Sequence, residues 1–348
     1  MNNNFEKKSN SNLLRGDATE KQHYVFQAYL RRFSSDSKNK MIWAYINNCI
    51  IKEVPIKSVA YSNKMYETKY LNADEISFFK LAVYILNREN IELHNLSNQY
   101  IAKYNELSNL YDSVNSFCND ILNNSDECTH KILEEKNDEI KNYNKANLIN
   151  INEKFHSNIE SELNGLITEV INLNLNEINN NKGRIVRDIW YQYFRTKTIR
   201  SSMKGVFSEM LDNERLCISN GIKAINVNIE NVLTPYLLFV PMCCSNNFNI
   251  KILKNETSIN FITSDQPVIN LYADYESNIP PSELMLYYPV SDKFALLVGG
   301  KTSFEIEHLT EIDRVNVLNY KIIEAHDNFL FSSDEKQLKD LVDYKQHL

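Results

Sequence analysis

Apolar and polar positions along this chain follow two different periods, one typical of helices and one typical of strands, and the chain alternates between them. Near the start of the chain, an apolar residue recurs every four positions at Val25, Tyr29 and Phe33, which is the spacing of one helix face. The pattern predicts a short amphipathic helix with His23 at its start and Gln27 one turn later.

Strands are predicted on either side of a long helical stretch. The apolar runs 41–46 and 49–54 flank Asn47-Asn48, a dipeptide that tolerates left-handed backbone, so we expect a β-hairpin. Residues 72–180 read as several helices separated by Asn-rich breaks. The last third alternates with period two, which predicts strands at 248–252, 259–262, 284–288 and 294–298, then a helix at 309–323 and a strand at 329–331.

Composition supports a folded protein rich in helix. Hydrophobic residues make up 43% and charged residues 24%, and 7 Gly with 7 Pro leave few tight turns. We therefore expect an α+β fold, mainly helical, with an N-terminal hairpin and a C-terminal antiparallel sheet. The polar N-terminal segment has no apolar stretch that could serve as a signal peptide, and the apolar run 232–244 is too short to span a bilayer. The 6 cysteines form no Cys-x-x-Cys pair. These features predict a cytoplasmic protein with no membrane contact.

Charge is distributed unevenly along the chain, whose net charge is -7. Residues 182–204 are rich in Lys and Arg and contain Asp188 as their single acid, whereas acidic residues concentrate between 74 and 177. This uneven distribution favours a local anion-binding site over an extended surface that binds nucleic acid. The alternative is that part of the basic segment forms ion pairs with the acidic segment. We predict a disordered tail at 1–20, a core domain at 21–70 and 151–348, and an inserted helical accessory region at 71–150.

The basic segment lies in a helical pattern that runs from Ile185 to Phe207. A continuous helix would place Gln192, Thr196 and Arg200 in one stripe among apolar residues, with Arg195 beside Gln192. A guanidinium fork suits a carboxylate or phosphate ligand, so these four residues are candidate binding residues. The alternative is a buried structural ion pair in which Glu160 supplies the carboxylate.

Four further polar residues are candidates. His23 could act as a base and Gln27 could orient a ligand, although His23 could equally cap its helix. Asp265 follows a predicted strand, where it could bind a metal, accept a proton or bond its own turn. Asn319 lies on the apolar side of a late helix and needs a hydrogen-bond partner there.

Evidence for a metal is weaker. Three Glu-x-x-His spacings have the helical geometry of dinuclear carboxylate sites, but no supporting Glu-bearing helices can be identified. We name no metal ligands, and a divalent metal stays open as a cofactor. The spacings are Glu127 with His130, Glu153 with His156, and Glu305 with His308.

Six segments in order resemble a bacterial family, domain-of-unknown-function family 4238. The resemblance implies a mixed helix-and-sheet fold and supplies no reaction. The chain departs from the family pattern at Phe26, where the family usually has Pro, and in the insertion at 71–150. The segments are 23–33, 59–61, Gln192 with 195–196 and Arg200, 263–267, 288–291 and 317–319.

Two functions fit these observations. The first is an enzyme or effector, such as a hydrolase or nuclease, that acts on a phosphate-bearing substrate such as a nucleotide or nucleic acid. In that interpretation His23 or Asp265 transfers the proton. The chain is rich in Asn, Lys and Ile, which indicates an AT-rich gene, and such a gene fits phage defence. The second is a non-catalytic module that binds a protein partner, or a second copy of itself, through residues 71–150.

Overall fold

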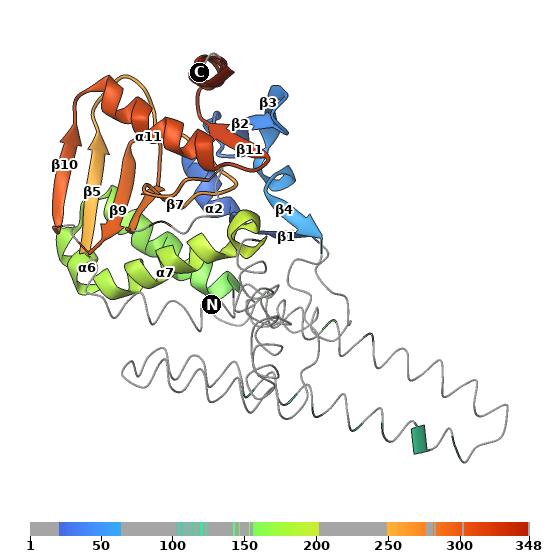
Figure 1. The fold of residues 1–348 in the computed structure, drawn as a ribbon. Helices are drawn as coiled ribbons and strands as arrows, with labels where there is room; N and C mark the ends of the chain where they lie inside the picture. The colour runs from blue at the N-terminus through green and yellow to red at the C-terminus, as the bar shows by residue number, and fades with distance from the viewer. Residues whose placement is uncertain are drawn as a thin grey trace, which may run out of the picture. The chain divides into compact units, whose positions relative to one another are not determined.

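The computed structural model describes residues 21–63, 156–201, 249–275, 281, 283–300 and 303–346, with isolated positions between 102 and 153 (Figure 1). The chain divides into two compact units. One consists of Met1–Gln22, Asn63–Ser157 and Phe207–Leu238, and the other of His23–Ser62, Asn158–Val206 and Phe239–Leu348. The predicted tail at 1–20 lies outside the described residues, as does the predicted insertion at 71–150 apart from isolated positions. That division into domains stays a prediction.

The larger sheet of the second unit has 5 strands. Three neighbouring pairs are antiparallel, but the edge strand β10 runs parallel to β5, so that Ile306 lies opposite Ile252. In spatial order the strands are β10 (Glu305–Leu309), β5 (Asn249–Asn255), β9 (Phe294–Gly299), β8 (Met285–Pro289) and β7 (Ile269–Asn270).

A second sheet of 4 antiparallel strands contains the predicted hairpin. Asn47 and Asn48 have φ values of 51° and 54°, the left-handed conformation that was expected of this turn. The late strand β11 lies between the hairpin and β6, with Leu330 opposite both Tyr45 and Ser264. In spatial order the strands are β3 (Ile50–Pro55), β2 (Met41–Ile46), β11 (Phe329–Ser332) and β6 (Thr263–Ser264).

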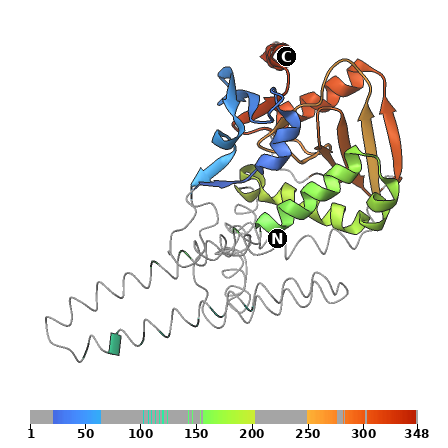
Figure 2. The ribbon, with the colours of Figure 1, turned by 180° about the vertical axis from the view of Figure 1, so that it is seen from behind.

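A short ladder joins β1 (Lys21–His23) to β4 (Tyr61–Asn63). The helices of the second unit pack against its sheets: α7 contacts β5, α11 contacts β10, β7 and β6, and α12 contacts β2, β3 and β11. Figures 1 and 2 show α6 and α7 near one end of the five-stranded sheet and α11 near the other. The helical elements are α2 (Gln27–Leu30), η1 (Arg31–Phe33), η2 (Ile56–Ser58), α6 (Leu175–Asn180), α7 (Lys182–Arg195), α11 (Ile312–Ala325) and α12 (Glu335–Gln346).

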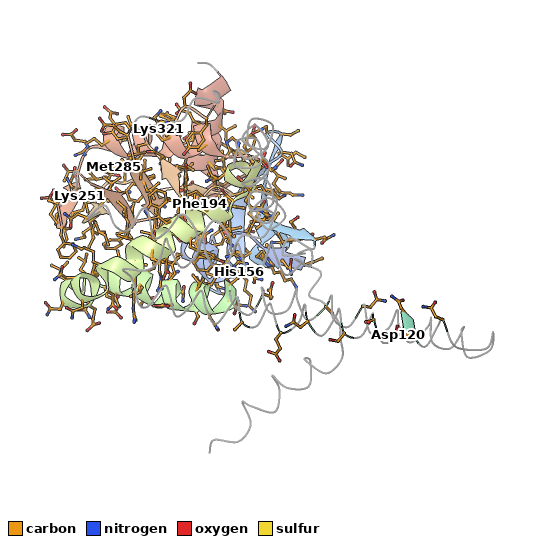
Figure 3. The ribbon with its side chains drawn as sticks, turned by 60° about the horizontal axis from the view of Figure 1, so that its bottom comes forward. Asp120, His156, Phe194, Lys251, Met285 and Lys321 are labelled. Atoms are coloured by element: carbon orange, nitrogen blue, oxygen red, sulfur yellow. The ribbon has the colours of Figure 1, made fainter. Side chains whose placement is uncertain are left out.

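A hydrophobic core joins the two larger sheets to α11 and α12, with Tyr45, Leu253 and Leu338 among its buried members. Figure 3 shows the side chains of the described residues, including Phe194 on α7 and Lys251 and Met285 on the five-stranded sheet. Within the described part of the chain, no helix combines the length and the apolar character needed to cross a membrane.

The predicted fold class was wrong in its proportions. Of the residues that the structure describes, 45% are helical and 26% lie in the strands of three sheets, so the fold is mixed rather than mainly helical. The C-terminal sheet is not purely antiparallel, because β10 pairs with β5 in parallel. The class α+β fits this mixture.

The predicted strand at 259–262 is absent. No ladder forms along it: the N–H of Asn260 donates to Gln337 Oε1 at 2.9 Å, that of Ile262 to Asn319 Oδ1 at 3.0 Å, and that of Phe261 to the carbonyl of Asp292 at 2.9 Å. The chain then enters β6 of the other sheet. Burial does not alternate in this segment, since Phe261 and Ile262 are both fully buried, so the period-two pattern did not indicate a strand here.

The predicted N-terminal helix is shorter than expected. Val25, Tyr29 and Phe33 are all fully buried, but the α-helix begins at Gln27 and His23 lies in β1. Phe26 has an extended backbone with ψ of 141°, and the N–H of Tyr24 donates to the carbonyl of Ala60 at 3.0 Å. That pairing holds the segment before Gln27 extended.

Candidate functional site

The basic helix is interrupted at its centre. α7 ends at Arg195, and Thr196 has an extended backbone with φ of -73° and ψ of 154°, before residues 197–201 resume a helical conformation. The Thr196 hydroxyl donates to the carbonyl of Tyr193 at 3.1 Å, which satisfies one of the carbonyls at the end of α7. The prediction of one continuous helix, with Gln192, Thr196 and Arg200 in a single stripe, was therefore wrong.

Arg195 is held by internal partners. The residue is 1% exposed, and its guanidinium forms an ion pair with Glu160 and donates a hydrogen bond to the main-chain oxygen of His23. It also lies 5.7 Å from the centre of the Tyr191 ring. Glu160 was predicted as the carboxylate of a structural pair with Arg200, whereas the arginine that it contacts is Arg195.

Gln192 lies one turn before Arg195 on the same face of α7, because residues three apart on a helix are neighbours. Its side chain is fully buried, and its Nε2 donates to the main-chain oxygen of Tyr24 at 3.2 Å. Gln192 and Arg195 thus bind the carbonyls of two consecutive residues, Tyr24 and His23. The last turn of α7 thereby fixes the backbone on which the His23 imidazole is mounted.

The His23 imidazole is half-buried and has a defined neutral form. Its Nε2 lies 3.4 Å from Nε2 of Gln27, an amide nitrogen that can only donate, so His23 Nε2 accepts and the ring proton is on Nδ1. Burial lowers the pKa of His23, the positive charge of Arg195 lowers it further, and a hydrogen bond with the Lys57 backbone acts in the opposite direction. His23 is thus held as a neutral ring with a lone pair on Nε2.

Asp265 is 3% exposed and organises a turn. Its carboxylate accepts the backbone N–H groups of Asp327 at 3.0 Å, Asn328 at 2.7 Å and Phe329 at 3.2 Å. Burial raises the pKa of Asp265 to about 6, against the effect of these hydrogen bonds. Burial raises the pKa of Tyr24, the residue after His23, and the charge of Asp265 raises it further. The turn before β11 is therefore built around this carboxylate.

Asn319 and Arg200 each have contacts of their own. Asn319 is fully buried; its Oδ1 accepts the N–H of Ile262 at 3.0 Å and its Nδ2 donates to the carbonyl of Asn260 at 2.9 Å. Arg200 is half-buried in the helical residues 197–201, and its backbone N–H donates to the carbonyl of Thr196 at 3.1 Å. Direct contacts thus join His23, Gln27, Gln192, Arg195 and Glu160, either to each other or to adjacent backbone.

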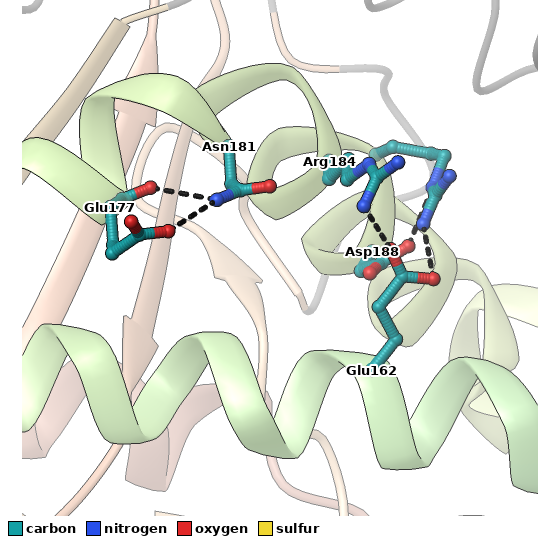
Figure 4. A network of polar contacts seen from close by, with 6 residues as sticks. Glu162, Glu177, Asn181, Arg184 and Asp188 are labelled. Carbon is teal, nitrogen blue, oxygen red and sulfur yellow. Dashed lines mark hydrogen bonds and ion pairs between the residues drawn. The ribbon is translucent and has the colours of Figure 1, made fainter.

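A charged network on α7 was not predicted (Figure 4). Asp188 is fully buried and accepts a hydrogen bond from Arg187 Nε at 2.7 Å, while Arg187 and Arg184 both contact Glu162, at 3.1 Å and 3.5 Å. Burial raises the pKa of Asp188 to about 7, against the charge of Arg187. The position of Asp188, a single acid among apolar and basic residues, was the available sequence signal.

The Glu-x-x-His spacings form no metal centre in the described residues, where no group of three or more His, Cys, Asp or Glu could hold a metal ion. His308 instead contacts Glu256 at 2.8 Å, and Glu305 pairs with Lys251 at 2.7 Å. Glu127 and His130 lie outside the described residues.

Comparison with known proteins gives a family but no activity. A family model described as "Protein of unknown function (DUF4238)" matches residues 21–336, nearly the whole chain. No curated protein and no solved structure matches the chain. The matched residues include His23, Gln27, Gln192, Arg195 and Asp265, and they confirm the resemblance seen in the sequence. The chain therefore belongs to the DUF4238 family of proteins of unknown function.

Proposed function

We propose that the chain is an enzyme, either a hydrolase or a nuclease, that acts on a phosphate-bearing substrate. In this enzyme the His23 imidazole accepts a proton during the reaction. The observation that carries this proposal is the state of His23. Its side chain is half-buried, its pKa is lowered, and Nε2 is the unprotonated nitrogen of the ring. A proton acceptor must be neutral at the working pH and must present a lone pair, and His23 meets both conditions.

The residues around His23 have distinct parts in this proposal. Gln27 contacts the accepting nitrogen and orients the group that approaches it. Gln192 and Arg195 are positioning residues, because they bind the main chain of Tyr24 and His23 rather than the imidazole. Glu160 holds Arg195 in that role.

The substrate class rests on charge. The segment 182–204 concentrates basic residues in a chain of net charge -7, and Arg200 is the cation of that segment proposed to meet the phosphate. Arg195 is not assigned this task, since Glu160 already balances its charge. We infer that the substrate is a nucleotide or a nucleic acid. The amino-acid composition indicates an AT-rich gene, which suggests phage defence as the biological setting.

A turnover screen tests the proposal. Purified protein is assayed against nucleotides and single- and double-stranded nucleic acids, with and without added Mg²⁺. We expect His23→Ala to lose at least about a hundredfold of any turnover, the usual contribution of a general base. His308→Ala is the matched control, because His308 is a half-exposed histidine on β10 that contacts Glu256. Turnover that His23→Ala retains in full would refute the assignment.

A second candidate function is the non-catalytic module. It is favoured by Arg195, the most deeply buried arginine of the basic segment, whose guanidinium is bound by Glu160 and a main-chain oxygen rather than left for a ligand. In this case the wild type shows no turnover in the screen. Its molar mass in solution, measured by light scattering, then exceeds that of one chain and falls to one chain when residues 71–150 are deleted.

A further inference from the structure

Arg32 is a partly buried cation that donates hydrogen bonds to three neutral groups of the described residues. Its Nη1 donates to the carbonyl of Ala28 at 3.2 Å, and its Nη2 donates to the carbonyl of Asn164 at 3.0 Å and to Thr168 Oγ1 at 3.2 Å. The Thr168 hydroxyl in turn donates to the carbonyl of Asn164 at 3.0 Å, so it can only accept from Arg32. These contacts hold the guanidinium in one orientation between η1 and the helical residues 158–171.

No carboxylate of the described residues lies within ion-pair distance of Arg32. Burial lowers the pKa of Arg32, and the groups that oppose this effect are the phenols of Tyr288 and Tyr29, which are neutral at physiological pH. A guanidinium also has more N–H groups than these contacts use. Partial burial of a cation without a counter-ion is costly unless an anion completes the site.

The surroundings carry excess positive charge. The fully buried hydroxyl of Tyr288 is acted on by two guanidinium groups, Arg32 and Arg195, and by one carboxylate, Glu160. Glu160 is paired with Arg195, so among the residues that the structure describes no carboxylate balances the charge of Arg32. Among the described residues the Tyr288 hydroxyl also has no hydrogen-bond partner, although its ring stacks on Tyr29 at 5.1 Å.

We propose that Arg32 is an anion-binding residue that takes a phosphate group through the N–H groups left by its three neutral contacts. A phosphate brings negative charge and offers oxygens that can accept from the Nε–H and the second Nη1–H of Arg32. The inference deepens the proposed function, on which it rests for the identity of the anion: it gives the phosphate of the substrate a binding residue outside the basic segment. Binding does not require turnover, so the two proposals can fail separately.

Phosphate binding can be measured with inorganic phosphate as the probe. The thermal unfolding midpoint is followed against phosphate concentration at constant ionic strength, with chloride as the reference salt, because a ligand that binds only the folded state raises the midpoint in a saturable way. We expect a saturable rise in the wild type and in Arg31→Gln. Arg31 is the exposed neighbour in the same 3-10 turn, and its replacement removes the same charge. We expect no saturable rise in Arg32→Gln.

Further variants separate binding from folding and from turnover. Arg32→Lys keeps the charge but loses the fork, and we expect phosphate affinity at least about tenfold weaker. His23→Ala should keep the phosphate response of the wild type even where it loses turnover. An absent or non-saturable response in the wild type, equal responses in Arg32→Gln and wild type, or equal losses in Arg31→Gln and Arg32→Gln would each overturn the proposal.

Discussion

Arg195 donates a hydrogen bond to the main-chain oxygen of His23, and this contact joins the last residue of α7 to the strand that precedes α2. The same guanidinium is paired with Glu160. One buried arginine therefore links three segments that are far apart in the sequence. It also affects the chemistry of the site, because its charge lowers the pKa of His23.

Replacing Arg195 with Met should change both stability and the titration of His23. The variant leaves Glu160 and the His23 carbonyl without their partner, and breaking a buried ion pair by removing one member costs about 3–5 kcal/mol. Since Glu160 is 24% exposed, we expect the lower end of that range in the free energy of unfolding. Loss of the positive charge should also raise the pKa of His23, measured by NMR.

The double variant Arg195→Met with Glu160→Gln is the control for this prediction. It removes both charges, so we expect it to be more stable than Arg195→Met alone while its His23 pKa stays raised. Equal destabilisation in the single and double variants would show that Glu160 and Arg195 are not coupled.

Tyr29→Phe tests the link between α2 and the sheets. The Tyr29 hydroxyl donates to the carbonyl of Pro289 at 2.6 Å and accepts from Thr263 Oγ1 at 2.7 Å, and the whole side chain is buried. Removing the Tyr29 hydroxyl leaves the Pro289 carbonyl and the Thr263 hydroxyl without this partner, which lowers the free energy of unfolding by about 1–3 kcal/mol. Denaturant unfolding should show this loss, whereas an unchanged midpoint would mean that the contacts add nothing to stability.

Asp265→Ala should destabilise the chain more than Asp265→Asn. The carboxylate accepts three backbone N–H groups through its two oxygens, and the alanine variant leaves all three without it. The asparagine variant keeps one accepting oxygen. We expect a loss of about 3 kcal/mol or more for Asp265→Ala, because each abandoned buried donor costs about 1 kcal/mol or more. Equal stability of the two variants would contradict this role.

Stability should fall as pH rises towards neutrality, and Asp188 should cause part of the fall. Its folded-state pKa of about 7 lies above the ordinary value of 3.8, so the folded chain holds a proton that the unfolded chain has released. The stabilisation is present below about pH 4 and is lost as pH rises through about 7, by up to about 4 kcal/mol at about 1.4 kcal/mol per pH unit. Asp188→Asn should flatten the profile of unfolding free energy between these pH values. A profile as steep as that of the wild type would exclude Asp188 as its source.

Local patterns in the sequence predicted the elements that local chemistry determines. The hairpin at Asn47-Asn48 was correct because two residues that tolerate left-handed backbone leave the chain one favourable turn. The strands at 284–288 and 294–298 were correct within a residue, because they are adjacent along the chain and pair with each other. The parallel pairing of β10 with β5 could not be read in this way, since their residues are about fifty positions apart.

The candidate site was predicted in part for the same reason. Gln192 and Arg195 were marked as polar groups among apolar neighbours, but the break at Thr196 depends on a backbone conformation that helical periodicity does not reveal. Their partners, the carbonyls of Tyr24 and His23, are main-chain atoms that every residue has, so no side-chain pattern points to them. Arg32 was overlooked because its distinguishing feature is the neutrality of its partners, which only a structure shows.

The most direct test of the account is an NMR titration of His23 in the wild-type chain, with the ring nitrogens labelled and the signal assigned by its loss in His23→Ala. We predict a pKa below the ordinary value of 6.5 and a neutral form protonated on Nδ1. A pKa above 6.5, or a neutral form protonated on Nε2, would contradict the assignment of His23 as the proton acceptor.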